Sequence, residues 1–160
     1  YTYNEKNQLI EKVDIVKQYF SNFNDKNLPQ TIESEKTAID SVFGYRKELK
    51  YDSKNNIIEE KKYSKIHNQI KIDITFYKYD NFNNVIELNR ESEPKEEYPI
   101  IMYGERAHYQ NEKFRYVYSK DNLWVEKYWI VENKEYLIQE RKLKKKRTHN
   151  SRLARLRILW

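Results

Sequence analysis

The chain has 160 residues, of which 38% are hydrophobic, 35% are charged and none is cysteine. This length suggests one domain, and the absence of cysteine excludes disulfides and thiolate metal sites. No stretch approaches the roughly 18 to 20 apolar residues that a membrane-spanning helix needs, and no signal peptide is present. The sequence starts at Tyr1 rather than Met, so we expect a processed or excised piece, which is compatible with a lost signal or lipid anchor.

The charge is distributed unevenly along the chain. The formal net charge is +6, but residues 141–160 hold nine Lys and Arg residues and no acidic residue. The other 140 residues carry 22 basic and 25 acidic groups, a net charge of −3. Binding to nucleic acid or to an anionic membrane is therefore expected only through the basic tail.

The aromatic content argues against disorder, although a chain this polar could be disordered. There are 15 Tyr, six Phe and three Trp residues. Such side chains bury a large area and keep a polar group at the rim. A thin sheet with one hydrated face needs residues of this kind.

Five nine-residue segments of the chain align without gaps and reveal an internal repeat. Position one is aromatic, position two is Asp, Asn or Ser, position five is Asn and position seven is apolar. Position nine is Glu in four of the five segments. The segments are residues 3–11, 23–31, 51–59, 79–87 and 118–126, and their position-five residues are Asn7, Asn27, Asn55, Asn83 and Asn122.

The physics of a β-hairpin accounts for each of these positions. Asp, Asn or Ser at position two can accept a hydrogen bond from the backbone two residues further on. A tight turn usually needs one residue with a positive φ, and Asn is among the best residues for it other than Gly. Only two glycines are present. The aromatic residue before the turn and the apolar residue after it are expected to pair across the two strands.

The intervening stretches predict further strands. The segment Ile70–Phe76 and the residues from Phe114 to Tyr118 alternate between apolar and polar positions, as half-buried strands do. Trp124–Val131 is apolar on both faces apart from Glu126 and Lys127, so it is a candidate central strand. A turn at 132–134 is expected to precede a strand at 136–143.

A helix is the alternative interpretation near the N-terminus. Five apolar residues there have the 4-3-4-3 spacing of a helix face, and residues 37–43 are also compatible with a short helix. We prefer strands for residues 8–16 because the repeat predicts one there. The five residues are Leu9, Val13, Val16, Phe20 and Phe23.

The pattern Tyr-Asp-x-x-Asn-Asn-Ile/Val-Ile-Glu at 51–59 and 79–87 resembles the YD repeat of the Rhs (rearrangement-hotspot) class. The usual family sequence has Gly where this chain has Asn55, Asn83 and Asn122. Residues 116–143 look like the end of many short YD-repeat proteins of bacterial envelopes. The resemblance is clearest at 49–92 and 114–143, whereas 32–48 and 93–112 fit poorly.

The resemblance implies a sheet of tandem β-hairpins in a bacterial envelope or secreted protein. In large members the repeats form a shell that encloses a toxin. This chain is too short for a closed shell, and we see no self-cleaving motif of the family in it. It is therefore similar to the short, stand-alone members.

No signature of an enzyme or a cofactor site is found in the sequence. Phosphate loops, a Gly-x-Ser-x-Gly motif and a His-Glu-x-x-His motif are all absent, so we expect no catalytic, cofactor-binding or metal-binding residues. The histidines are isolated in sequence and are interpreted as residues on the sheet surface; they are His67, His108 and His149. An acidic cluster could bind a cation but is better explained as a solvated loop; it contains Glu91, Glu93, Glu96 and Glu97.

Aromatic residues near the C-terminus provide the candidate ligand contacts. Tyr and Trp on one face of a sheet can stack on sugars or grip a protein partner. The alternative, which we weight more heavily, is that they form core pairs between neighbouring strands. The candidates are Tyr118, Trp124, Tyr128 and Trp129.

The basic tail, residues 144–160, has three interpretations. A stripe of Leu153, Leu156 and Leu159 or Trp160 beside Arg152 and Arg155 suits an amphipathic helix that binds lipid, nucleic acid or a partner groove. A disordered terminus and a segment of foreign origin are the other two.

The sequence thus predicts an all-β domain over residues 1–143, followed by the tail. We expect a twisted, largely single-layered antiparallel meander of ten to twelve strands, with a short N-terminal helix as the alternative at the start of the chain. The expected function is a non-enzymatic binding or scaffold module of the bacterial envelope or secreted space, with a protein or carbohydrate partner. The alternative is a fragment of a larger toxin-packaging protein of the Rhs class.

Overall fold

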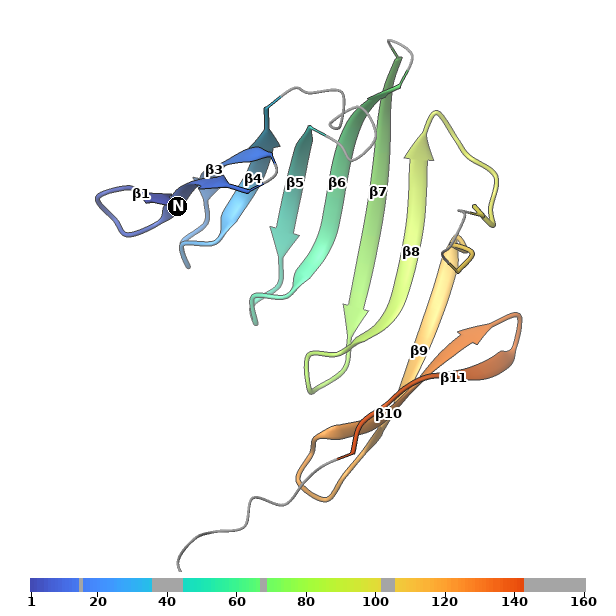
Figure 1. The fold of residues 1–160 in the computed structure, drawn as a ribbon. Helices are drawn as coiled ribbons and strands as arrows, with labels where there is room; N and C mark the ends of the chain where they lie inside the picture. Colours follow the sequence, from blue (N-terminus) through green and yellow to red (C-terminus); the bar gives the residue numbers. More distant parts are fainter. Residues whose placement is uncertain (15, 36–44, 67–68, 102–105, 143–160) are drawn as a thin grey trace, which may run out of the picture.

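The chain folds into one antiparallel sheet whose eleven strands lie side by side in sequence order (Figure 1). The computed structural model describes residues 1–14, 16–35, 45–66, 69–101 and 106–142. The strands are β1 Thr2–Tyr3, β2 Leu9–Val13, β3 Lys17–Phe23, β4 Pro29–Ser34, β5 Arg46–Tyr51, β6 Ile57–Ile66, β7 Gln69–Tyr79, β8 Val85–Glu93, β9 Asn111–Tyr118, β10 Trp124–Val131 and β11 Lys134–Glu140.

The predicted all-β meander is confirmed, and eleven strands lie within the expected range. The helix considered near the N-terminus is wrong, because strands β2 and β3 occupy that part of the chain and the described residues contain no helix. The apolar residues of these two short strands fit the period of a helix as well as that of a strand. Pairing with the neighbouring strands selects the strand. Residues 37–43 and 144–160 lie outside the described residues.

Two details near the C-terminus differ from the prediction. Strand β10 is paired on both sides, but it is next to the edge of the sheet rather than at its centre. Strand β11 begins two residues earlier than expected and ends at Glu140, whereas the prediction extended to Leu143. The strand begins earlier because the turn before it contains only Glu132 and Asn133. Both have positive φ, 50° and 63°, as a two-residue type I′ hairpin turn requires.

The five repeat asparagines all adopt the left-handed backbone conformation that the repeat predicts. Their φ angles are 58°, 61°, 71°, 62° and 57° for Asn7, Asn27, Asn55, Asn83 and Asn122. In each turn the N–H of this Asn donates to the carbonyl of position two, at 2.9 to 3.2 Å. A turn closed in this way, with its last residue left-handed, is the three-residue hairpin loop with a bulge.

The side chain at position two caps every one of these turns. In the third repeat, Oδ1 of Asp52 accepts hydrogen bonds from the backbone N–H of Lys54, at 2.8 Å, and of Asn56, at 2.9 Å. At the other four turns, equivalent pairs of backbone N–H groups donate to the side chains of Asn4, Asn24, Asp80 and Ser119. The predicted bond to the residue two further on is therefore confirmed, and a second bond, four residues on, was not anticipated.

The predicted aromatic–apolar pair across each hairpin is also confirmed. Position one lies directly opposite position seven in all five repeats. Such cross-strand pairs are the unit from which a sheet gains its stability. The pairs are Tyr3 with Leu9, Phe23 with Pro29, Tyr51 with Ile57, Tyr79 with Val85 and Tyr118 with Trp124.

Neighbouring repeats are linked by the same residues that shape the turns. The position-one hydroxyl groups of Tyr51 and Tyr79 donate to the position-seven carbonyl of the preceding repeat, at 2.8 and 2.7 Å. At position six, the Gln8 amide donates to Asn27 at 2.7 Å, and the Asn56 amide donates to Asn83 at 3.1 Å. The turns at this end of the sheet are therefore tied to one another through side chains.

The sheet forms a single layer with a small apolar core. Among the described residues, the buried hydrophobic side chains are Leu49, Phe114 and Val131. Because successive side chains of a strand point to opposite faces, the paired residues define two faces. We call the one that carries Lys62 and Asp73 the strap face and the one that carries Tyr63 and Ile72 the tyrosine face.

We expect the substitution Asn55→Val to lower the free energy of unfolding by about 1–2 kcal/mol, since a β-branched residue disfavours positive φ. Urea unfolding followed by circular dichroism would measure this. Asn55→Gly is the matched control, because Gly adopts the same conformation without a Cβ penalty. Equal stability of the Val and Gly variants would contradict the role assigned to the turn asparagines.

Candidate functional site

A loop joins β8 to β9 (Figure 1) and packs against the strap face, where its residues Tyr98, Ile100 and His108 line a pocket together with side chains of β6 and β7. We call its described residues, 94–101 and 106–110, the strap. Ile100 and His108 exchange two backbone hydrogen bonds, at 2.9 and 2.8 Å. The strap is held to the sheet by an ion pair of 2.7 Å between Lys71 and Glu96, and by a hydrogen bond of 2.7 Å from Arg90 to the carbonyl of Tyr109.

A completely buried carboxylate anchors the other end of the strap. Glu112, on β9, has no exposed surface and forms ion pairs with Arg90 of β8 and Arg106 of the strap. Its Oε2 lies 2.9 Å from the Arg106 guanidinium without the alignment of a hydrogen bond. The guanidinium of Arg106 also lies 4.8 Å from the ring centre of Trp129 and 5.5 Å from that of Phe114. Cation–π contacts thus add to the ion pairs.

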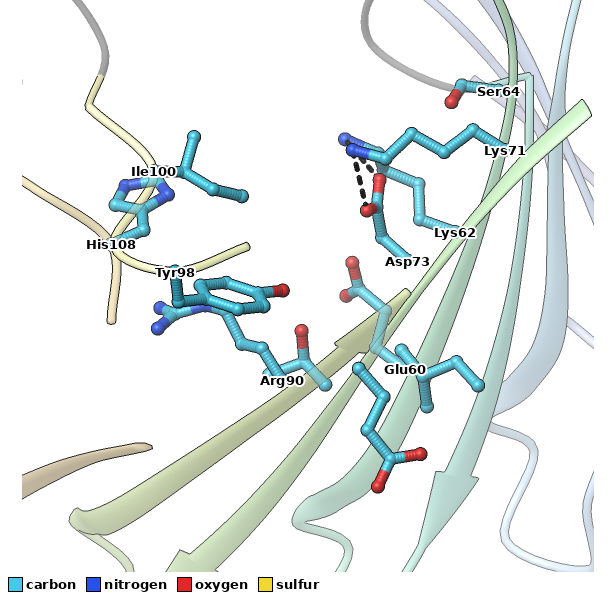
Figure 2. Close-up of a pocket in the computed structure, with 12 residues that line it drawn as sticks. Glu60, Lys62, Ser64, Lys71, Asp73, Arg90, Tyr98, Ile100 and His108 are labelled. Carbon is cyan, nitrogen blue, oxygen red and sulfur yellow. Dashed lines mark ion pairs between the residues drawn. The ribbon is translucent and has the colours of Figure 1, made fainter. Parts of the chain in front are cut away.

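A pocket of about 290 Å³ lies between the strap and the strap face (Figure 2). Figure 2 shows Tyr98, Ile100 and His108 of the strap on one side and Lys62, Lys71 and Asp73 of the sheet on the other. Ser64, which is 2% exposed, also lines it. Polar side chains dominate the lining.

Several charged side chains of this pocket are paired with one another or with neighbouring residues of the sheet. Asp73 lies 2.9 Å from Lys71 and 4.0 Å from Lys62, and Glu60 lies 3.1 Å from Lys47. Burial alone would lower the pKa of Lys71, but hydrogen bonds to Glu96 and Asp73 outweigh it and raise the pKa. Lys71 therefore stays charged at neutral pH, and its ion pairs with Asp73 and Glu96 hold the strap against the sheet.

A second pocket, of about 610 Å³, opens on the tyrosine face. Its centre is a row of residues that lie directly opposite one another on β3 to β7, namely Tyr19, Glu33, Arg46, Tyr63 and Ile72. Tyr45, Glu48 and Ile70 also line this pocket. Large rings with a few convergent polar groups are typical of ligand pockets of this size. We call it the tyrosine pocket.

Arg46 is the polar centre of the tyrosine pocket. Its Nη2 donates to Glu48 at 2.7 Å, its Nη1 lies 3.8 Å from Glu33, and its guanidinium stacks 5.7 Å from the ring centre of Tyr63. The hydroxyl of Tyr63 donates to Glu48 at 3.0 Å. The Nε of Arg46 is buried, and no hydrogen-bond partner for it is found among the described residues.

Three of the four aromatic residues that the sequence nominated as ligand contacts lie on or beside the strap face. Trp129 lies directly opposite both Phe114 and Tyr136, so three rings form a row across β9, β10 and β11. Trp124 packs edge-on against Tyr116, with ring centres 5.9 Å apart, and the Arg141 guanidinium lies 3.3 Å from its ring centre. Both tryptophans are half-buried and contact neighbouring side chains of the sheet.

Tyr118 and Tyr128 are placed differently. Tyr118 contacts Phe82 with a ring distance of 4.5 Å and donates a hydrogen bond to Asp80 of the preceding repeat. Tyr128 follows the strand alternation to the tyrosine face, where its hydroxyl donates to Glu126 at 2.7 Å and Arg115 lies 4.1 Å from its ring centre. The four candidates are therefore not brought together in one site.

Sequence reasoning did not find the tyrosine pocket. Its rings come from two strands, β3 and β6, and from Tyr45, the residue before β5, which are far apart in sequence. Tyr19 and Tyr63 do stand at alternate positions of predicted strands, but their shared row depends on the register of five strands. His108, interpreted as a sheet-surface residue, instead lies in the strap and lines the charged pocket.

The acidic cluster of the 91–97 segment is divided by the fold. Glu96 pairs with Lys71, whereas Glu91, Glu93 and Glu97 are exposed. Within the part of the chain that the structure describes, no group of three His, Cys, Asp or Glu residues could hold a metal ion. The same described residues contain no helix with the length and apolarity needed to cross a membrane.

We expect Glu112→Ala to lower the free energy of unfolding by about 3 kcal/mol, because it leaves the largely buried Arg90 without its carboxylate. Chemical unfolding would measure the loss. Glu135→Ala is the matched control, since Glu135 pairs with Arg115 where both side chains are 44% exposed and exposed pairs contribute little. The two variants should differ clearly; an equally small effect of both would mean that Glu112 does not anchor the strap.

A second prediction concerns alkaline pH. Burial, followed by the hydrogen bond to Asp80, raises the pKa of Tyr118 from 10.0 to about 12. Because the folded-state pKa is the higher one, this contribution to stability is complete below pH 10 and is lost as the pH rises towards 12. Unfolding measured between these limits should show a shallower loss for Tyr118→Phe than for the unsubstituted chain. The exposed Tyr136→Phe should retain the full slope, and an unchanged slope in Tyr118→Phe would count against the assignment.

Comparison with known proteins assigns no family to the chain. No protein-family model matches the sequence, and no curated protein matches it either. The YD-repeat resemblance therefore stays a prediction that rests on the five repeats themselves.

Proposed function

We propose that the chain is a non-enzymatic binding or scaffold module of the bacterial envelope or secreted space, which holds a protein or carbohydrate partner on a face of its sheet. The resemblance to short YD-repeat proteins motivates the location. The absence of nucleophile, phosphate-loop and metal motifs in the sequence motivates the non-enzymatic assignment. A site on the structure identifies a function more securely than sequence motifs do. The proposal is therefore argued from the surface of the sheet.

The observation that carries the proposal is the single-layered sheet. Domains usually pack a sheet against a second layer in order to bury its apolar face. Here eleven strands bury three hydrophobic side chains among the described residues. The backbone ladders and the turn network hold the sheet together, so the faces are available for a partner.

The tyrosine pocket is the part of the surface that is best suited to contact that partner. Tyr19 is 39% exposed and Ile70 is 57% exposed, beside a polar group, Arg46, that can orient a ligand. Tyrosine is enriched among the residues that dominate binding energies, because its ring is large and rigid and its hydroxyl is polar.

Cosedimentation of the labelled chain with bacterial envelope material tests this proposal. The probes are purified peptidoglycan sacculi and outer-membrane vesicles from a Gram-negative bacterium. We expect saturable binding to at least one of them and an affinity about tenfold lower for Tyr19→Ala, which corresponds to a contact of about 1.4 kcal/mol. Tyr19 is exposed, so the variant should fold normally, and its circular dichroism spectrum checks this.

Lys62→Ala is the matched control, because Lys62 precedes Tyr63 on β6 and points to the strap face. It should bind as the unsubstituted chain does. Retention of the chain by neither probe would refute the proposal, as would equal losses for Tyr19→Ala and Lys62→Ala.

A toxin-packaging fragment is the second candidate, and the links between repeats favour it. Each repeat bonds to the next through side chains at or beside its turn. The terminal strands β1 and β11 each pair on one side only within the described part of the chain. Further hairpins could therefore extend the sheet at either edge. A parent polypeptide many repeats longer than this chain would favour packaging over a stand-alone module.

A further inference from the structure

We propose that the strap face of β8 to β11 binds single-stranded nucleic acid. This inference goes beyond the function proposed above and does not depend on it, because it concerns the face of the sheet opposite the tyrosine pocket. Three observations carry it, namely the division of charge between the two faces, cations without a carboxylate partner, and aromatic rings interleaved with those cations.

Acidic side chains of β8 to β11 are divided very unevenly between the two faces of the sheet. The register places six carboxylates and two cations on the tyrosine face, namely Glu87, Glu91, Glu93, Glu126, Glu135, Glu140, Lys113 and Arg115. On the strap face of the same strands, Glu112 is the only carboxylate among the described residues, and it is buried against Arg90 and Arg106. Lys127 and Lys134 also lie on this face. The strap face is therefore positively charged here, and the opposite face is acidic.

Two of the cations on this side of the sheet lie over rings instead of against carboxylates. The Nζ of the half-buried Lys127 lies 4.5 Å from the ring centre of Phe114, and the guanidinium of the exposed Arg141 lies 3.3 Å from that of Trp124. Within the described ranges, neither Lys127 nor Arg141 has an ion pair. Burial, and after it the charge of Arg106, lower the pKa of Lys127. An anion beside Lys127 would offset this repulsion.

Aromatic rings alternate with the cations along the same face. Tyr136 of β11 is 46% exposed and packs beside Trp129, with ring centres 5.9 Å apart. Arg106 lies 4.8 Å from the ring centre of Trp129, and Arg141 lies over Trp124 near the other end of β10. The two tryptophans are separated by about 17 Å of extended strand. Proteins that bind single strands combine cations and rings in this way, because phosphates lie against the cations while bases stack on the rings.

The rings distinguish nucleic acid from other polyanions. Cations attract any polyanion and gain affinity from the release of its counterions, but the carboxylates of an acidic peptide and the headgroups of an anionic membrane offer no base to stack. The cationic surface also continues along the chain beyond Arg141, since residues 141–160 hold nine Lys and Arg residues and no acidic residue. Variants of the sheet residues therefore have to separate binding by the face from binding by bulk charge.

Fluorescence anisotropy of labelled oligonucleotides with the full chain tests the proposal. The probes are oligothymidylate and oligouridylate of about 20 nucleotides, which distinguish DNA from RNA and leave their bases free to stack. We expect saturable binding of at least one of them, weakened about fivefold or more in Lys127→Gln and in Arg141→Gln. Each loss of a phosphate contact should also make the slope of log affinity against log salt shallower by about 0.7. Tyr136→Ala should weaken binding about tenfold and leave this slope unchanged, because it removes stacking and no charge.

Each type of variant has a matched control on the tyrosine face. Lys113→Gln removes the same charge from an exposed lysine of β9, and Tyr19→Ala removes a ring that is 39% exposed. Both should bind the oligonucleotides as the unsubstituted chain does. Circular dichroism and thermal unfolding should show that all five variants are folded.

Several results would each overturn the proposal. They are absence of binding to both oligonucleotides, an equal loss in Lys113→Gln and in the two strap-face cation variants, and unweakened binding by Tyr136→Ala. Polyglutamate or phosphatidylserine vesicles bound as tightly as the oligonucleotides would also overturn it, because charge alone would then explain the affinity. None of these results bears on Tyr19-dependent binding to envelope material, so either proposal can fail without the other.

Discussion

The left-handed asparagine at each repeat turn is the constraint on which the rest of the sheet depends. A hairpin loop of this kind fixes the register of the two strands that it joins. With Asn55 at φ 71° and Asp52 capping the same turn, Tyr51 must face Ile57. The same geometry recurs at all five turns, so the positions of the aromatic residues follow from the turns rather than from a core.

A sheet without a second layer has to be stabilised from within its own plane. Backbone ladders, cross-strand rings and exposed ion pairs replace a hydrophobic interior, which explains why a chain with 38% hydrophobic residues folds at all. Individually such contacts are weak. The links between turns, such as Tyr79 to Ile57 and Gln8 to Asn27, couple one hairpin to the next and make the many small contributions cooperative.

The two faces use charged residues for different purposes. On the strap face, the buried Glu112 with Arg90 and Arg106 fastens a loop across the sheet. On the tyrosine face, Arg46 lies among rings with one donor unused. The first cluster holds one arrangement of the loop, because the Glu112 carboxylate lies against two cations, whereas the second places charged groups beside exposed rings.

The sequence by itself determined the five turns, their left-handed asparagines and the antiparallel meander that they imply, because these follow from local rules of backbone conformation and alternation. It also placed one aromatic residue opposite one apolar residue in each repeat. Only the tertiary structure decided that Tyr19, Glu33, Arg46 and Tyr63 form one row, since that row depends on the cumulative register of strands joined by loops of irregular length. The aromatic residues nominated from sequence were separated for the same reason: Tyr128 and Trp129 are adjacent in a strand, and adjacent residues of a strand face opposite sides.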